Sequence, residues 1–159
     1  MLKDHSYTCF QGGKIKKSEK IFELLGELDK LNTSLGMARA FSRKKSLKRR
    51  LFFLQEEILE AGSLIALNKD LKEFRKKATL LEKEIEKIKD PKLKEFVKPG
   101  KTKSEVFLHF ARVVCREAER KAVALEKKNY LPLVEFLNRL SLFLFWLGVK
   151  ETSVFVQTP

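Results

Sequence analysis

The chain has 159 residues, the length of one domain, and can bury a core without metal or disulfide staples. Its 34 Lys and Arg against 21 Asp and Glu give a formal net charge of +13, which favours anionic partners without choosing among nucleotides, nucleic acid or an acidic protein. Cys9 and Cys115 have no metal-ligand spacing and indicate free thiols in a reducing, cytoplasmic compartment. The longest apolar run is about half the ~20 residues of a membrane span, so a soluble protein without a membrane is expected.

Apolar residues spaced three and four apart predict an all-α fold, with strand signals nearly absent. A first helix is expected over about 18–42, with Ser18 as its N-cap. A basic connection leads to helices over about 46–68 and 71–89. Asp90-Pro91 ends the third helix, because proline disfavours helical backbone in the residue before it.

The connection over residues 90–103 is long for a compact helical domain, and loops of that length are usually functional or disordered. Phe96 within it argues against disorder. Thr102 and Glu105 form a capping-box signature for a fourth helix, which is expected to run to about residue 127.

Pro132 marks the start of a fifth helix that is apolar nearly all round and is therefore expected at the centre of a bundle. Its polar exceptions are Glu135, Asn138 and Arg139. They predict either an ion pair between Glu135 and Arg139 with Asn138 bonded to a neighbouring helix, or a polar cleft shared with the fourth helix. The tail over 150–159 contains a segment that could be extended.

Arg112, Arg116 and Arg120 are spaced four residues apart and stack on one face of the fourth helix. Like charges so placed repel by roughly 0.2 to 0.5 kcal/mol per pair, so the three need an anion or acidic partners. Glu119 is one local partner and cannot neutralise all three. We call these residues the arginine stripe.

Five segments, in order, resemble the PduO-type ATP:cob(I)alamin adenosyltransferases, or corrinoid adenosyltransferases. They are "GELDKLNTSLGMA" (26–38), "LQEEILEAGSLIA" (54–66), "FVKPGKT" (96–102), "LHFARVVCREAERKAVAL" (108–125) and "FLNRLSLFLF" (136–145). The fourth is similar to the diagnostic R-x-V-C-R-R-A-E-R stretch. The resemblance as a whole covers roughly residues 10–148.

The resemblance implies a five-helix bundle, with 1–159 as a single corrinoid adenosyltransferase-like domain, 1–17 as its nucleotide loop and 150–159 as a tail. It implies a homotrimer that binds ATP between subunits, usually with Mg²⁺, and the corrinoid close by. The implied reaction moves the 5′-deoxyadenosyl group of ATP to the cobalt of cob(I)alamin and releases triphosphate. A corrinoid reductase is a candidate electron donor.

The resemblance also assigns residues. Arg112 matches the arginine that pairs with Asp29 across the subunit interface, and Arg116 matches the one that contacts ATP near the transferred group. Phe96 matches the loop phenylalanine that keeps cobalt free of its lower ligand. The other residues carried over into the site are Asn32, Glu119, Arg120 and Asn138.

The N-terminal segment departs from the family's T-G-D-x-G-T-T stretch, whose glycines let backbone amides approach phosphates. The corresponding residues 2–8, "LKDHSYT", lack those glycines. The residues retained from the nucleotide-binding region are Thr8, Gly12, Gly13, Lys14 and Lys17.

Three charge positions also change, since Lys30 replaces a glutamate, Glu117 replaces an arginine and Leu142 replaces an aspartate of the family pattern. Two interpretations follow, a divergent enzyme that cradles triphosphate with lysines or a bundle that has lost catalysis. The retained arginine stripe favours the first. A basic bundle that binds nucleic acid through residues 42–50 is less favoured, because that run has no interleaved aromatic residues.

Overall fold

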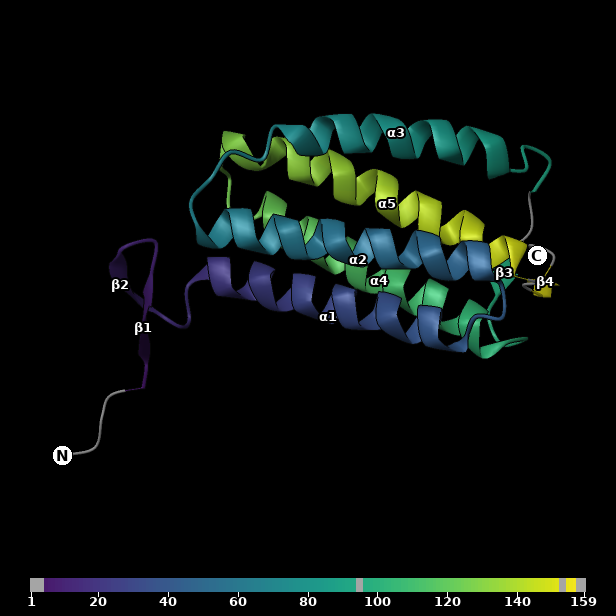
Figure 1. The fold of residues 1–159 in the computed structure, drawn as a ribbon, viewed down its shortest axis with the longest axis horizontal. Helices are drawn as coiled ribbons and strands as arrows, with labels where there is room; N and C mark the ends of the chain where they lie inside the picture. Colours follow the sequence, from purple (N-terminus) through teal and green to yellow (C-terminus); the bar gives the residue numbers. More distant parts are fainter. Residues whose placement is uncertain (1–4, 94–95, 152–153, 157–159) are drawn as a thin grey trace.

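The computed structural model of the chain describes residues 5–93, 96–151 and 154–156. These residues form five α-helices, with a short 3-10 turn at Lys128–Tyr130. The helices are α1 (Lys20–Phe41), α2 (Lys45–Ala66), α3 (Glu73–Ile88), α4 (Lys103–Val123) and α5 (Leu131–Lys150). They lie alongside one another in an elongated bundle (Figure 1), as the apolar periodicity predicted.

Two small antiparallel strand pairs stand at opposite ends of this bundle (Figure 1). β1 (Tyr7–Phe10) pairs with β2 (Gly13–Lys16), and β3 (Phe96–Lys98) pairs with β4 (Val154–Val156). The expectation that strands are nearly absent was wrong at these places, although the extended segment predicted in the tail is confirmed by β4. Gln11 and Gly12 have φ of 52° and 80°, and two successive positive φ angles are what a tight hairpin turn requires.

The core lies between the inner faces of all five helices. Four leucines spaced three and four residues apart in α1 are buried: Leu24, Leu28, Leu31 and Leu35. Phe136 of α5 packs edge-on against Phe74 of α3, with ring centroids 5.1 Å apart. By length and composition residues 128–150 could cross a membrane, but half of that apolar window is buried among the other helices, as in the core helix of a bundle.

The helix ends agree only in part with expectation. The capping box is confirmed, since Thr102 Oγ1 accepts from Glu105 N at 3.1 Å and Glu105 Oε2 accepts from Thr102 N at 3.2 Å. Pro132 lies in the first turn of α5, as predicted. Ser18 is not the N-cap of α1; that position is Glu19, whose side chain makes no capping bond.

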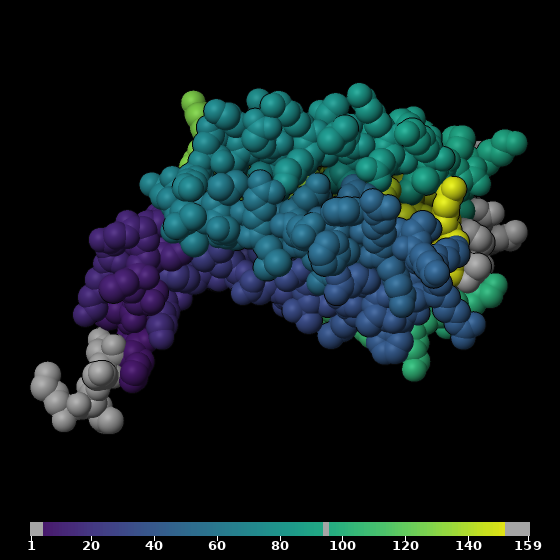
Figure 2. Space-filling view, in the orientation of Figure 1, coloured from purple at the N-terminus to yellow at the C-terminus, as the bar shows by residue number. Residues whose placement is uncertain are grey.

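The start of α1 is held by the hairpin instead. Backbone bonds from Lys17 N to Ser6 O (2.9 Å) and from Glu19 N to Lys16 O (3.1 Å) lead β2 directly into the helix. At its other end α4 stops at Val123 rather than near residue 127, and Glu126 has a positive φ of 54°, which α-helical backbone does not allow. In the space-filling view the purple hairpin stands at one end of the body and the yellow end of α5 emerges at the other (Figure 2).

Candidate functional site

The arginine stripe lies on the outer part of α4. Arg116 and Arg120 are exposed and Arg112 is half-buried. Across the residues that the structure describes, none of the three forms an ion pair with a carboxylate. Burial, followed by the positive charge of Arg116, lowers the pKa of Arg112, so the stripe does contain the repulsion inferred from its spacing.

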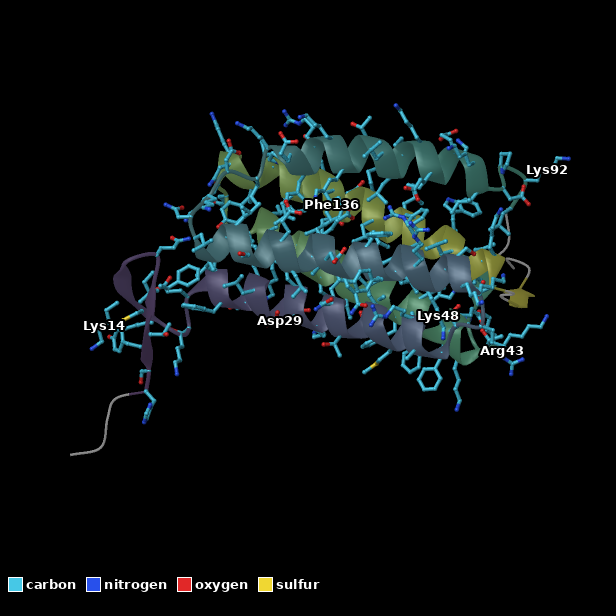
Figure 3. The ribbon with its side chains drawn as sticks, in the orientation of Figure 1. Lys14, Asp29, Arg43, Lys48, Lys92 and Phe136 are labelled. Carbon is cyan, nitrogen blue, oxygen red and sulfur yellow. The ribbon has the colours of Figure 1, made fainter. Side chains whose placement is uncertain are left out.

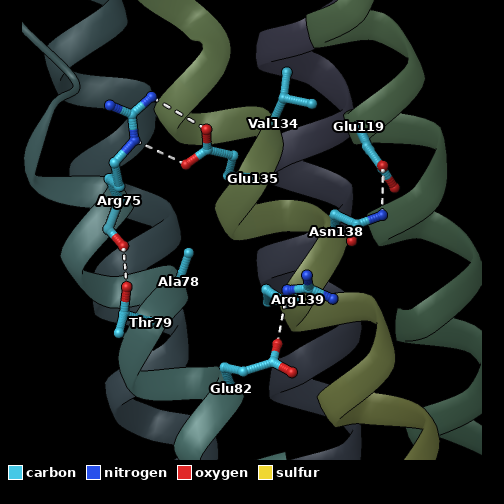
Figure 4. Close-up of a pocket in the computed structure, with 9 residues that line it drawn as sticks. All are labelled: Arg75, Ala78, Thr79, Glu82, Glu119, Val134, Glu135, Asn138 and Arg139. Carbon is cyan, nitrogen blue, oxygen red and sulfur yellow. Dashed lines mark hydrogen bonds and ion pairs between the residues drawn. The ribbon is translucent and has the colours of Figure 1, made fainter.

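Glu119, predicted as one local partner of the stripe, forms no ion pair with its arginines among the described residues. Its Oε1 accepts a hydrogen bond from Asn138 Nδ2 at 3.0 Å, which joins α4 to α5 (Figure 4). The predicted bond from Asn138 to a neighbouring helix is therefore confirmed, and it brings together two of the predicted site residues. Both line a pocket of about 480 Å³ between α3, α4 and α5.

The same pocket shows that the predicted ion pair within α5 was wrong. Glu135 instead accepts from Arg75 of α3, with Nε–Oε2 at 2.9 Å and Nη2–Oε1 at 3.1 Å. Arg139 pairs with Glu82, Nε to Oε2 at 2.7 Å (Figure 4). The hydrogen bond from Arg75 lowers the pKa of the Glu135 carboxyl. Because α5 residues at this pocket face α3 across the groove, the nearest opposite charges come from another helix rather than from the next turn.

Two of the departures from the family pattern prove to be reciprocal. Lys30 stands where the family has glutamate and Glu117 where it has arginine, and in this chain Lys30 Nζ lies 3.2 Å from Glu117 Oε2. The hydrogen bond from Lys30 lowers the pKa of Glu117. The two residues therefore join α1 to α4 through opposite charges, and Lys30 also pairs with Glu27 of its own helix at 2.9 Å. Leu142, the third departure, lies on α5 with about a third of its surface exposed.

Asp29 and Arg112 are not paired within one chain. Asp29 is exposed on α1 (Figure 3), and the Arg112 guanidinium lies over the Phe145 ring, 5.6 Å from its centroid. Asn32, one turn after Asp29, lies toward α2, where its backbone carbonyl oxygen accepts a hydrogen bond from Gln55 Nε2 at 3.0 Å. Its side-chain Oδ1 is buried with no hydrogen-bond partner among the described residues.

Phe96 is 66% exposed at the end of the bundle where β3 lies. The loop that follows it is anchored by the completely buried carboxylate of Glu105. Glu105 Oε2 accepts hydrogen bonds from three backbone N–H groups of this loop, those of Gly100 (3.4 Å), Lys101 (2.9 Å) and Thr102 (3.2 Å). Sequence reasoning identified this glutamate only as a helix cap, although the capping box already placed it beside the Phe96 loop.

His109 continues the connection from this loop toward the stripe. Its Nε2 lies 3.9 Å from Glu105 Oε1, and its ring meets Phe145 edge-on at 6.2 Å. Phe145 is the ring on which Arg112 lies. Burial lowers the pKa of His109 against an opposing effect of Glu105. The contacts therefore run without a break from the loop of Phe96 to the first arginine of the stripe.

The five retained N-terminal residues lie on or beside the β1–β2 hairpin, which Figure 3 marks at Lys14. Lys14 Nζ lies 5.0 Å from the centroid of the Tyr7 ring, and Gln11 Nε2 donates to Ile65 O at 2.7 Å, which ties the turn to the end of α2. No described contact joins Thr8, Gly12, Gly13, Lys14 or Lys17 to the stripe of the same chain.

Neither cysteine belongs to this site. Both are free, as predicted, with Cys9 exposed and Cys115 buried. Burial raises the pKa of the Cys115 thiol, which donates to Leu137 O at 3.2 Å. Within the described part of the chain no three His, Cys, Asp or Glu side chains gather to hold a metal ion.

Taken together, the fold and these side chains define a mostly helical bundle that carries, among the described residues, an arginine stripe without carboxylate partners on α4 and an exposed phenylalanine on β3. A family profile described as cobalamin adenosyltransferase matches residues 3–151. The chain therefore belongs to the cobalamin adenosyltransferase family.

Individual relatives agree with this assignment. The chain is 33% identical over 153 residues to the corrinoid adenosyltransferase of Bacillus subtilis, covering 89% of this chain and 79% of that protein. It is 33% identical over 165 residues to that of Mus musculus, covering 92% and 70%. A variant PduO-type adenosyltransferase from Lactobacillus reuteri, complexed with ATP, superposes with a TM-score of 0.82 at 22% identity over all of both chains. Another variant, complexed with cobalamin and ATP, gives 0.81 at 24% identity over 98% and 95%.

Proposed function

We propose that this protein transfers the 5′-deoxyadenosyl group of ATP to cob(I)alamin, forming adenosylcobalamin and inorganic triphosphate. Family membership and the relatives named as corrinoid adenosyltransferases support the reaction. The observation on this chain that carries the proposal is the arginine stripe, three cations on one helix face without a carboxylate partner among the described residues. Such a stripe requires an anion, and the triphosphate of ATP has the charge to supply it.

The chemistry explains why guanidinium groups serve this reaction. Cobalt(I) attacks C5′, the cobalt–carbon bond forms with the electron pair of the metal, and the C5′–O bond breaks with its pair leaving on triphosphate. Fixed guanidinium groups bind phosphate oxygens in pairs, position the nucleotide and stabilise the departing charge. We assign this role to Arg116 and Arg120, with Glu119, Asn138 and Asn32 in the same site. Mg²⁺ would enter with the nucleotide and neutralise part of its charge.

The corrinoid is proposed to lie on the side of Phe96. An apolar wall there would exclude water and the lower ligand from cobalt, which makes cobalt easier to reduce to Co(I). The 66% exposure of Phe96 in a single chain leaves its ring available for this contact. The electron would come from a corrinoid reductase. We place the protein, as a single domain, in the cytoplasm, where free thiols such as Cys9 persist.

We further propose that the site is completed between copies in a homotrimer. Five apolar side chains are exposed on the neighbouring helices α1 and α4, and we call them the α1–α4 patch: Met37, Phe41, Val106, Phe110 and Val113. Arg116 follows Val113 by three residues, which places it about 60° around the helix from the patch. A neighbouring copy on the patch would thus bring its Asp29 to Arg112 and its hairpin, with Thr8, Gly12, Gly13, Lys14 and Lys17, to the nucleotide.

The alternative of a bundle that has lost catalysis is weakened by the Lys30–Glu117 pair. If the site had lost its function, random substitutions would be expected to leave charged side chains without a partner. Here the two substituted residues have opposite charges, and Lys30 Nζ lies 3.2 Å from Glu117 Oε2. The altered residues therefore form a contact between α1 and α4 beside the stripe. This supports a divergent enzyme.

The deciding experiment is an anaerobic assay with ATP, Mg²⁺ and chemically reduced cob(I)alamin, followed by the absorbance change as the cobalt–carbon bond forms. Turnover above a protein-free control is expected. Arg116→Ala should abolish it, a loss of at least about hundredfold in kcat, the scale on which removal of one transition-state donor acts. Arg49→Ala, an exposed arginine on α2, is the control and should retain activity. Absence of turnover in the unaltered protein would instead indicate the inactive bundle.

A further inference from the structure

A second pocket, of about 750 Å³, lies between the α1–α2 connection and the start of α4. Four basic side chains line it: Arg43, Lys44, Lys101 and Lys103. Of these, only Lys44 has a carboxylate partner in the described ranges, Glu151 at 2.6 Å. Arg43, Lys101 and Lys103 form no ion pair with any described residue, so the lining keeps positive charge that attracts an anion.

The walls of this basic pocket are fixed by buried and partly buried hydrogen bonds. Glu105 accepts from the backbone of Lys101 on one side, and Ser104 Oγ, itself 4% exposed, donates to Ala38 O of α1 at 3.4 Å. On the other side Ser42 Oγ accepts from Lys44 N at 3.2 Å. A site whose backbone is already ordered loses less entropy when a ligand binds.

The basic pocket lies at the Phe96 end of the bundle. Figure 1 shows β3 at the end where α1 meets α2, and Figure 3 labels Arg43 there. Lys101 follows Phe96 by five residues, a span of at most about 18 Å even when fully extended. A ligand of the size of a corrinoid that contacts Phe96 can therefore also reach Lys101.

We propose that the basic pocket binds the phosphodiester of the nucleotide tail of the corrinoid. This inference rests on the proposed function, since it concerns where the corrinoid substrate lies. The corrin ring of cobalamin carries neutral amides, and its fixed negative charge is the phosphodiester that joins the ring to the lower base. When Phe96 keeps that base away from cobalt, the tail and its phosphate must leave the underside of the ring. The cationic pocket at the same end receives them.

A consequence is a preference for cobalamin over cobinamide, which has the same corrin ring but lacks the nucleotide tail and its phosphate. The triphosphate of ATP shares the phosphate chemistry. Two features distinguish ATP from the corrinoid as the ligand of the basic pocket. ATP carries no corrin ring to contact Phe96, and its triphosphate is proposed to bind the arginine stripe instead.

The test compares binding of cob(II)alamin and cob(II)inamide, measured by absorbance titration at fixed ionic strength, for the unaltered protein and for a Lys101→Glu, Lys103→Glu double variant. A Lys83→Glu, Lys87→Glu variant on the exposed face of α3 makes the same change in net charge away from the pocket. ATP affinity is measured for each protein. Circular dichroism confirms that the helices remain.

The expected result is a roughly tenfold weaker affinity of the pocket variant for cob(II)alamin, with cob(II)inamide and ATP unchanged and the α3 variant unaffected. Equal weakening for both corrinoids, or for neither, would overturn the inference, as would a loss confined to ATP. Salt-dependent retention of nucleic acid that the pocket variant alone loses, without a change in corrinoid affinity, would identify a nucleic-acid surface instead. Since binding is measured without turnover, an inactive protein would contradict the proposed function while this result still stands on its own.

Discussion

His109 is a buried imidazole with a charge on either side, Glu105 in the preceding turn and Arg112 in the following one. Burial lowers its pKa in the folded chain, so the folded state holds it neutral where the unfolded chain takes up a proton. Stability from this residue is therefore present above the unfolded pKa of about 6.5 and is lost as pH falls below it, with a slope of at most about 1.4 kcal/mol per pH unit.

Urea unfolding between about pH 5.5 and 7.5, above the range where most carboxylates titrate, measures this slope. His109→Gln keeps a polar side chain that does not titrate and should flatten the dependence. A slope unchanged in that variant would show that other groups cause it.

Gly148 is fixed by the same imidazole. A Cβ at this position would lie 2.6 Å from His109 Nε2, closer than such atoms approach, and the buried ring has little room to yield. Gly148→Ala is expected to destabilise the fold by about 1 to 3 kcal/mol. Gly62→Ala on α2 is the control, because its nearest neighbour is Leu25 Cδ2 at 4.0 Å, and it should be neutral or stabilising by up to about 1 kcal/mol. Thermal unfolding distinguishes the two, and equal melting temperatures would contradict the packing argument.

At the scale of elements, the start of α4 and the Phe96 loop depend on one carboxylate. Glu105→Ala removes the acceptor of three backbone N–H groups and should cost about 1 to 3 kcal/mol. Glu105→Gln keeps a side-chain oxygen in the capping box and should lose less. If the loop positions Phe96, the alanine variant will raise KM for the corrinoid and leave KM for ATP unchanged, and glutamine will restore most of the corrinoid affinity. A parallel rise in both constants would assign Glu105 to stability alone.

The elements also show which features a sequence can predict. The five helices follow from apolar residues at intervals of three and four, and the capping box from two residues three apart, so both are local signals. The pairs Arg75–Glu135 and Arg139–Glu82 join α3 to α5, and no spacing along one helix contains that information. The β1–β2 hairpin was missed because its strands have only four residues each and its turn residue Gln11 is not typical of positive φ.

At the scale of the whole molecule, several exposed features of α1, α4 and the hairpin bear on the proposed homotrimer. Asp29 is exposed and unpaired with Arg112, the stripe lacks counter-charges in the described chain, and the α1–α4 patch exposes apolar rings to water. The hairpin projects beyond the bundle with its lysines exposed (Figure 1). The neighbouring copy proposed above would account for each of these by covering the patch, since exposed apolar surface of this kind is typical of protein interfaces.

Phe110, 46% exposed near the middle of the α1–α4 patch, tests the assembly. Phe110→Lys places a charge where a neighbour would bury the ring, so sedimentation velocity should change from a trimer to a monomer while circular dichroism stays the same. Adenosyl transfer should be lost with the trimer, because Asp29 and Arg112 would no longer meet. Leu59→Lys, at a position 55% exposed on α2, controls for adding a lysine to an apolar surface and should leave both trimer and activity intact. A monomeric unaltered protein with full activity would show instead that one chain completes the site, and the exposure of Asp29 would then need another explanation.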